Sequence, residues 1–149
     1  YGGKKTMWQF LKDLAEGKEF EHQVLEIAHK EFPSEIWELN PEKKWVDIIS
    51  TNNSIEVKFD RLSESTWNLF IEIECSGIPS WLNAYKDLSV YAYWTWSNLF
   101  LFNPIRLSLW LGDKRLRRVK GGDWWRVLGV LLPISVAAQL ASKIIKLWQ

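Results

Sequence analysis

The feature that most constrains the fold is a pair of short apolar segments, residues 45–50 and 55–59, separated by Thr51-Asn52-Asn53-Ser54. Both segments are rich in β-branched and aromatic residues, which favour strands, and the four polar residues between them are typical of a turn. The stretch therefore predicts a β-hairpin. Because side chains alternate between the two faces of a strand, such a hairpin also determines which residues meet on one side.

A turn with residues 52–53 at its tip would place Ile49 opposite Glu56. Asp47 would then lie opposite Lys58. Paired residues project to the same side of a sheet, so Asp47, Glu56 and Lys58 would converge on one face. The other face would hold only apolar side chains, namely Val46, Ile48, Ile55, Val57 and Phe59. A slip of one residue would spoil both faces, so we expect this register.

Two carboxylates and a lysine crowded on one sheet face are costly unless something binds there. Neighbouring carboxylates repel each other unless a cation neutralises them, and Mg²⁺ prefers carboxylate oxygens. An ion held by Asp47 and Glu56 would act as a Lewis acid and lower the pKa of a bound water. Lys58 would orient that water, help to deprotonate it, or stabilise charge on a scissile phosphate. The alternative is a plain surface hairpin with a cross-strand pair of Asp47 and Lys58.

The net charge of +1 hides a division of the chain into two halves. Residues 1–76 carry 9 basic and 15 acidic side chains (net −6), and residues 77–149 carry 10 basic and 3 acidic ones (net +7). A basic half favours a polyanionic partner such as a phosphate backbone, although an ordinary dipolar surface is the alternative. The candidate phosphate contacts are Lys86, Lys114, Arg115, Arg117, Arg118 and Lys120.

Other features exclude several classes of protein. The single cysteine, Cys75, rules out an internal disulfide scaffold and a zinc site with two cysteines, and His22 and His29 are too few for a histidine-rich metal site. The longest apolar stretch, 127–141, is too short and too interrupted to span a bilayer, and the start of the chain has no apolar leader. We therefore expect a cytoplasmic protein without a membrane segment. Two expectations fit the start of the chain, which has no initiator methionine: either Met7 is the native start and residues 1–6 are an addition, or further residues precede Tyr1.

Hydrophobic periodicity predicts an α/β domain with a mixed sheet. A helix is expected over 18–31, with a short separate helix over 7–14 that ends near Gly17. The order α-β-β-β-(α)-β is followed by further mixed elements. Strands are expected over 45–50, 55–59, 69–75, 88–95, 99–103, 115–119 and 127–132, and later helices over 105–111 and 135–147.

The motif Asp47…Glu56-Val57-Lys58 resembles the signature of the PD-(D/E)xK nuclease superfamily, on the hairpin where that family carries it. The resemblance implies a restriction-endonuclease-like core, a mixed β-sheet flanked by helices in the order αβββαβ. It implies metal ligation by Asp47, Glu56 and the Val57 carbonyl. Holliday-junction resolvases place a further acidic ligand in the first helix, which implies a role for Glu21, with Glu26 as the second choice.

Further along, the chain resembles phage- and virus-encoded members of this superfamily. The shared stretches are Glu56-Val57-Lys58-Phe59-Asp60, Thr66-Trp67-Asn68, Glu72-Ile73-Glu74, Gly77-Ile78-Pro79-Ser80-Trp81, Gly121-Gly122-Asp123 and Leu132-Pro133. Trp67 and Trp81 stand where the pattern has glycine. If glycine serves a positive φ there, tryptophan should disturb it. Glu72 and Glu74 should share a strand face, where they either support the metal site or lie at a solvated edge.

These features together predict one nuclease-like domain over 1–149, in which a basic C-terminal extension, 104–149, packs on the core. The expected activity is that of a Mg²⁺-dependent DNA endonuclease, with Mn²⁺ as a substitute, and the expected setting is DNA recombination or repair. The alternatives are an inactive nucleic-acid-binding domain of the same fold, a nuclease selective for junctions or flaps, an RNA nuclease, and a protein-interaction domain. Related resolvases are dimers, so a homodimer is a further expectation. Its interface would use Leu140, Ile144, Leu147 and Trp148, unless these residues dock on the sheet.

Overall fold

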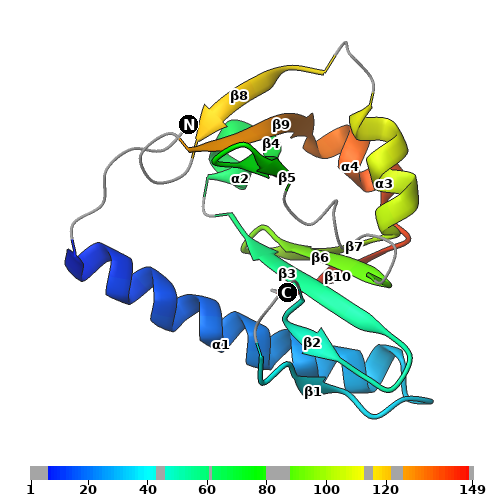
Figure 1. Cartoon of the computed structure of the whole chain (residues 1–149). Coiled ribbons are helices and arrows are strands. Elements are labelled where there is room, and N and C mark those ends of the chain that lie inside the picture. The colour runs from blue at the N-terminus through cyan, green and yellow to red at the C-terminus, as the bar shows by residue number, and fades with distance from the viewer. Residues whose placement is uncertain are drawn as a thin grey trace.

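A computed structural model of the chain describes residues 7–42, 46–60, 62–79, 88–112, 116–121 and 126–147 (Figure 1). The side chains of 9–11 and 13–17 lie outside this description. The elements, in chain order, are α1 (Met7–Glu31), β1 (Glu38–Leu39), β2 (Ile48–Ile49), β3 (Ser54–Phe59), α2 (Ser63–Thr66), β4 (Asn68–Cys75), β5 (Ile78–Pro79), β6 (Val90–Trp94), β7 (Asn98–Phe102), α3 (Pro104–Leu111), β8 (Arg118–Gly121), β9 (Val127–Pro133), α4 (Ile134–Leu140) and β10 (Lys143–Lys146).

The strands form two sheets rather than the single sheet that the sequence predicts. The larger sheet has the order β1-β2-β3-β6-β7-β10, and its β3–β6 pair is parallel while the other pairs are antiparallel. The smaller sheet is antiparallel, with the order β5-β4-β9-β8. The mixed α/β class with a mixed sheet is thus confirmed. The predicted third strand, β4, does not pair with the hairpin. The edge of β3 is occupied by β6, and β4 pairs with β9 in the smaller sheet.

One face of the six-stranded sheet packs against α1 (Figure 1). Phe20, Val24 and Ala28 recur at four-residue spacing and are buried on one side of this helix. They meet apolar residues from alternate positions of the strands, and the Phe20 and Phe59 ring centroids lie 4.0 Å apart. The strand contribution to this cluster includes Ile48, Ile55, Val57, Phe59, Ala92, Trp94, Leu99 and Leu101. The apolar face predicted for the hairpin is therefore found, except that Val46 packs against the cluster on the other side.

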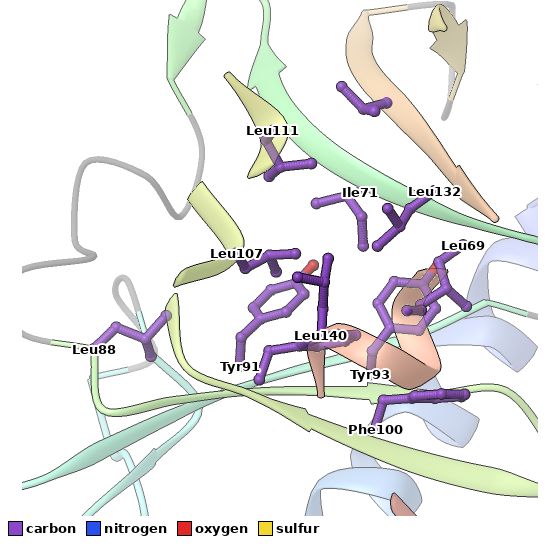
Figure 2. Close-up of a cluster of buried hydrophobic side chains, with 13 residues drawn as sticks. Leu69, Ile71, Leu88, Tyr91, Tyr93, Phe100, Leu107, Leu111, Leu132 and Leu140 are labelled. Atoms are coloured by element: carbon purple, nitrogen blue, oxygen red, sulfur yellow. The ribbon is translucent and has the colours of Figure 1, made fainter. Parts of the chain in front are cut away.

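The second cluster joins the two sheets. Tyr91 and Tyr93 point from β6 toward Leu69 and Ile71 of β4, with α3 and α4 beside them (Figure 2). Both tyrosine side chains are almost completely buried. Figure 1 shows β8, β9 and β4 one above another over the six-stranded sheet, and β4 contacts β3 through Glu72 and Lys58.

Several predicted elements need correction. The helix over 7–31 is continuous through Gly17, and the basic strand begins at Arg118 and includes Gly121. The predicted helix 135–147 ends at Leu140, because Ala141 is extended and the chain returns to pair with β7. The apolar spacing there fits a helix equally well, but β7 offers an unpaired edge. Leu140 is buried within this chain, and Ile144 pairs with Phe100 of β7 while remaining 39% exposed.

The predicted helix between the third and fourth strands falls in 80–87, outside the described residues. Within the described part of the chain, no helix combines the length and the apolar character needed to cross a bilayer.

Candidate functional site

The hairpin forms, but with a different register from the one predicted. Ile49 pairs with Ser54 and Ile48 pairs with Ile55, a shift of two residues. Glu56 and Lys58 still share one face of β3, because they are two residues apart on one strand. Asp47 precedes the paired residues of β2 and joins them through its own contacts, since it is hydrogen-bonded with Glu56 and with the Val57 amide. The change brings Asp47 beside Glu56 rather than Lys58, and the Asp47 amide donates to the Ile55 carbonyl oxygen at 3.1 Å.

Contacts outside the hairpin hold its loop in this register. The Ser50 amide donates to the Asn53 carbonyl oxygen at 2.8 Å, which closes a loop of four residues. The Ser50 hydroxyl donates to Glu35 at 2.8 Å, and the Asn53 side-chain amide donates to the same carboxylate. Ser89, the residue that precedes β6, is joined to the loop, because its hydroxyl donates to Asn53 Oδ1 at 2.8 Å. Glu35 and Ser89 are distant in sequence, so the hairpin alone could not indicate this register.

The Asp47 side chain accepts a hydrogen bond from β3 at a position where a neighbouring strand would otherwise do so. Because β2 pairs over only two residues, the Val57 amide has no β2 carbonyl opposite it and donates to Asp47 Oδ2 at 2.8 Å instead. The amide and carbonyl of one residue point to the same edge of an extended strand. The Val57 carbonyl oxygen therefore points to the edge where the Asp47 carboxylate lies. Two predicted metal ligands thus meet at one edge of β3.

Glu56 is the most perturbed carboxyl group of the site. Its side chain is only 13% exposed. Burial raises the pKa of Glu56 to about 8, opposed by the charge of Lys58 and reinforced by the charge of Asp47 and a hydrogen bond with it. Two carboxyl groups this close cannot both be ionised at low cost, so the site favours a shared proton or a cation.

Lys58 lies between the two sheets. Its Nζ is 3.6 Å from Glu56 Oε1 and 3.4 Å from Glu72 Oε2, which belongs to β4. Burial by itself would lower the pKa of Lys58, but the negative charges of Glu56, Glu72 and Asp47 outweigh it and raise the pKa above its usual value. Lys58 is therefore a cation at neutral pH. Of the predicted roles, this favours orientation and charge stabilisation over removal of a proton.

Two tyrosines of β6 stand beside these charges, because Glu56 pairs with Tyr91 and Lys58 pairs with Tyr93 in the parallel ladder. Burial raises the pKa of Tyr91 well above its usual value, and the carboxylates of Glu56, Glu72 and Asp47 add to the rise. Tyr91 is therefore a neutral phenol facing the site. The hairpin pattern could not reveal it, because the pairing of β3 with β6 joins segments more than thirty residues apart.

Asp60, the last residue of the Glu56–Asp60 motif, forms hydrogen bonds that stabilise the fold. Its Oδ2 accepts a hydrogen bond of 2.7 Å from the Tyr93 hydroxyl, and its Oδ1 accepts one of 2.8 Å from the Leu62 amide. The Tyr93 hydroxyl also accepts from the Phe70 amide at 3.0 Å. Asp60 therefore fastens the end of β3 to the start of β4. The alternation of Glu56, Lys58 and Asp60 along the sequence indicates that Asp60 lies on the same strand face, but it does not predict this structural role.

The predicted acids of the first helix, Glu21 and Glu26, belong to α1. Glu21 follows Phe20, which packs on the α1 side of the sheet, whereas Glu56 faces the other side. Lys58 and Asp47 are the charges that shift the pKa of Glu56, and Glu21 is not among them. Glu26 is exposed. Among the described residues, no three His, Cys, Asp or Glu side chains form a group that could hold a metal ion. The role assigned to Glu21 remains a prediction.

The two acidic residues of β4 have different surroundings. A bulge shifts the register so that Glu72 pairs with Gly129 and Glu74 with Leu128, its neighbour on β9. Because adjacent residues of β9 face opposite sides, Glu72 and Glu74 do as well, and the prediction of a shared face is wrong. Glu72 is the residue that contacts Lys58.

The remaining predicted residues divide into exposed ones and ones outside the description. Arg117, Arg118 and Lys120 are exposed on or next to β8. The residues outside the description are Lys86, Lys114, Arg115, Trp81 and Trp148. Trp67 is described, and it has a φ of 59° at the end of α2 with a side chain 74% exposed. The backbone conformation that favours glycine is therefore present, and tryptophan adopts it.

Comparison with known proteins adds no identification, because no family model, curated protein or solved structure matches the chain.

Proposed function

We propose that the chain is a metal-dependent deoxyribonuclease of the PD-(D/E)xK type, which hydrolyses phosphodiester bonds with a site built on β3. The observation that carries this proposal is that Asp47 lies beside Glu56, which shares one face of β3 with Lys58. Glu56 there has a pKa of about 8, and Lys58 lies 3.6 Å from it. Raised pKa values that combine burial with a specific charged neighbour are common at active sites.

The donor set fits a hard cation such as Mg²⁺ or Mn²⁺. Asp47 and Glu56 supply two adjacent carboxyl groups, and the Val57 carbonyl oxygen points to the Asp47 edge. Mg²⁺ in enzymes is commonly held by one or two carboxylates, with substrate phosphate and water completing its shell. When bound, the ion would supply Lewis-acid polarisation and would make a water molecule more acidic.

The side chains of the protein would then have separate roles. Asp47 and Glu56 hold the ion, and the Val57 amide fixes the Asp47 carboxylate by donating to it. Lys58, a cation held by Glu72, faces the place where charge develops on the reacting phosphate and stabilises it there. The buried phenol of Tyr91 closes the site on the β6 side and helps to exclude water.

The test is a cleavage assay on linear, supercoiled, single-stranded and branched DNA with Mg²⁺ or Mn²⁺. We expect cleavage by the intact chain, and losses of about 10²–10⁴-fold in Glu56→Gln and Lys58→Met. Arg106→Ala, an exposed change on α3 away from β3, is the control. DNA binding in EDTA should survive both site variants.

A second readout separates metal binding from turnover. Saturating Mn²⁺ should raise the unfolding temperature of the wild type, because a ligand that binds only the folded state stabilises it. The shift should vanish in Glu56→Gln. No cleavage of any of these substrates would contradict the proposal, and binding without cleavage would favour an inactive nucleic-acid-binding domain of this fold.

A further inference from the structure

The exposed basic residues of β8 and the one just before it, Arg117, lie on opposite faces of the four-stranded sheet. Arg118 pairs with Val130, and Val130 pairs with Ile71. Val130 and Ile71 are completely buried in the cluster between the sheets. Paired residues of neighbouring strands share a side, so Arg118 belongs to the face of the sheet that carries the core, and Lys120 follows it by alternation.

Arg117 lies on the opposite face. The Leu131 amide donates to the Arg117 carbonyl oxygen at 3.0 Å, and Leu131 pairs with Phe70. Phe70 stands between Leu69 and Ile71, both buried in the cluster, and so it points away from them. A second observation agrees, because a Cβ atom added to Gly129 would lie 2.4 Å from Phe70 Cζ. The Phe70 ring therefore lies across β9 on the face that Arg117 shares.

Glu72 links this face to the candidate active site. It pairs with Gly129, whose missing side chain would meet the Phe70 ring, so Glu72 and Phe70 share a side. The Glu72 carboxylate is 3.4 Å from Lys58 Nζ and forms an ion pair with it. Arg117, Phe70 and Glu72 thus mark one continuous surface that leads from the exposed edge strand β8 to Lys58. Arg118 and Lys120, adjacent in sequence to Arg117, lie on the other side of the sheet.

The spacing of this surface suits a nucleic-acid strand. Strands lie about 4.8 Å apart and rise about 3.4 Å per residue, so Arg117 and Glu72, two strands and two residues apart, are separated by roughly 12 Å. Phosphates of one duplex strand follow each other at about 3.4 Å along the axis. The Arg117 guanidinium therefore reaches a phosphate within about four nucleotides of one bound at Lys58. The half-buried Phe70 ring lies between them and offers an apolar contact to a sugar or a base.

We propose that the substrate strand leaves the active site across the Arg117–Phe70–Glu72 face of the four-stranded sheet, where Arg117 binds a backbone phosphate near the scissile one. This inference rests on the proposed nuclease function. It divides the basic cluster of the second half of the chain, because charge alone would give Arg117 and Arg118 the same importance.

The experiment compares Arg117→Ala with Arg118→Ala, two neighbouring exposed arginines on opposite faces. The affinity for a fluorescent DNA duplex is measured by anisotropy in EDTA at several salt concentrations. We expect Arg117→Ala to weaken binding about tenfold and to reduce the slope of log affinity against log salt by about 1. Arg118→Ala should cost less than threefold and change the slope by less than half as much. Arg117→Lys, which keeps the charge, should restore the slope.

A second variant tests the surface without removing a charge. Gly129→Ala pushes the Phe70 ring aside and should weaken DNA binding severalfold while the circular dichroism spectrum stays unchanged. Equal losses in Arg117→Ala and Arg118→Ala, or a larger loss in Arg118→Ala, would overturn the proposed path even if the protein cleaves DNA. A wild type that neither binds nor cleaves DNA would instead contradict the proposed function itself.

Discussion

The two ends of the motif Glu56–Asp60 contain the same kind of group, a carboxyl group, in opposite surroundings. At one end, Asp60 accepts hydrogen bonds from the Tyr93 hydroxyl at 2.7 Å and from the Leu62 amide at 2.8 Å. At the other end, Glu56 lies beside a second carboxyl group, and its pKa is raised to about 8. A carboxylate surrounded by donors stabilises the fold, whereas one placed against another carboxylate costs stability until a proton or a cation joins it. The comparison separates the structural end of the motif from the chemical end.

The largest expected effect is on the pH dependence of stability. Glu56 has a folded pKa of about 8 against an ordinary value of 4.5. Below pH 4.5 both states are protonated. As the pH rises to 8 the unfolded chain loses the proton first, so the free energy of unfolding falls. We expect the wild type to lose roughly 3–5 kcal/mol relative to Glu56→Gln between pH 5 and pH 9, measured by urea unfolding in EDTA. Parallel pH profiles of the two proteins would contradict this account of Glu56.

Removing the carboxyl group at the other end of the motif, that of Asp60, is expected to lower the stability rather than raise it. Asp60→Ala leaves the buried Tyr93 hydroxyl and the Phe70 amide without their carboxylate partner, and should lower the free energy of unfolding by about 2–3 kcal/mol at pH 7. Chemical denaturation measures this loss. Tyr93→Phe, which removes the donor and keeps the ring, is the matched variant and should cost less. A gain in stability in Asp60→Ala would contradict the structural role of Asp60.

A substitution of Glu72 tests whether its contact with Lys58 matters for catalysis. Glu72→Gln removes the β4 charge that holds Lys58, and should reduce Mn²⁺-dependent cleavage by about 10–100-fold with little change in DNA affinity. Glu74→Gln is the control, since Glu74 lies two residues along the same strand and faces the other side. If the two variants lose the same activity, the contact between Glu72 and Lys58 has no special role.

The smallest effect concerns the connection that follows Asp60. Trp67 has a φ of 59° and a side chain 74% exposed, so it bears the strain of the left-handed region without much burial. Trp67→Gly should raise the stability by about 1 kcal/mol. Trp96, with a φ of 79°, packs its ring on Phe59 at 5.2 Å, and Trp96→Gly should not be stabilising. Differential scanning calorimetry would reveal a stabilised Trp96→Gly or a destabilised Trp67→Gly, either of which contradicts this reasoning.

Local pattern was a good guide wherever one segment carried its own information. The alternation around Glu56 predicted a strand with a charged and an apolar face, and the spacing of Phe20, Val24 and Ala28 predicted the buried side of α1. The helix predicted over residues 143–146 is wrong, because their apolar spacing suits a helix as well as a strand and the edge of β7 is available for pairing. The bulge beside Glu72 was equally invisible, since it depends on how β9 pairs with β4.

The sequence by itself determined that Glu56 and Lys58 share one face of a strand, because residues two apart on a strand project to the same side. Tertiary structure alone decided the rest of the site. Contacts of the loop with Glu35 and Ser89 placed Asp47 against Glu56, and the second sheet brought Glu72 to Lys58. It also placed Arg117 and Arg118 on opposite faces of the four-stranded sheet. The physical reason is the same in each case, since the pairing of distant strands depends on burial and hydrogen bonds that no single segment contains.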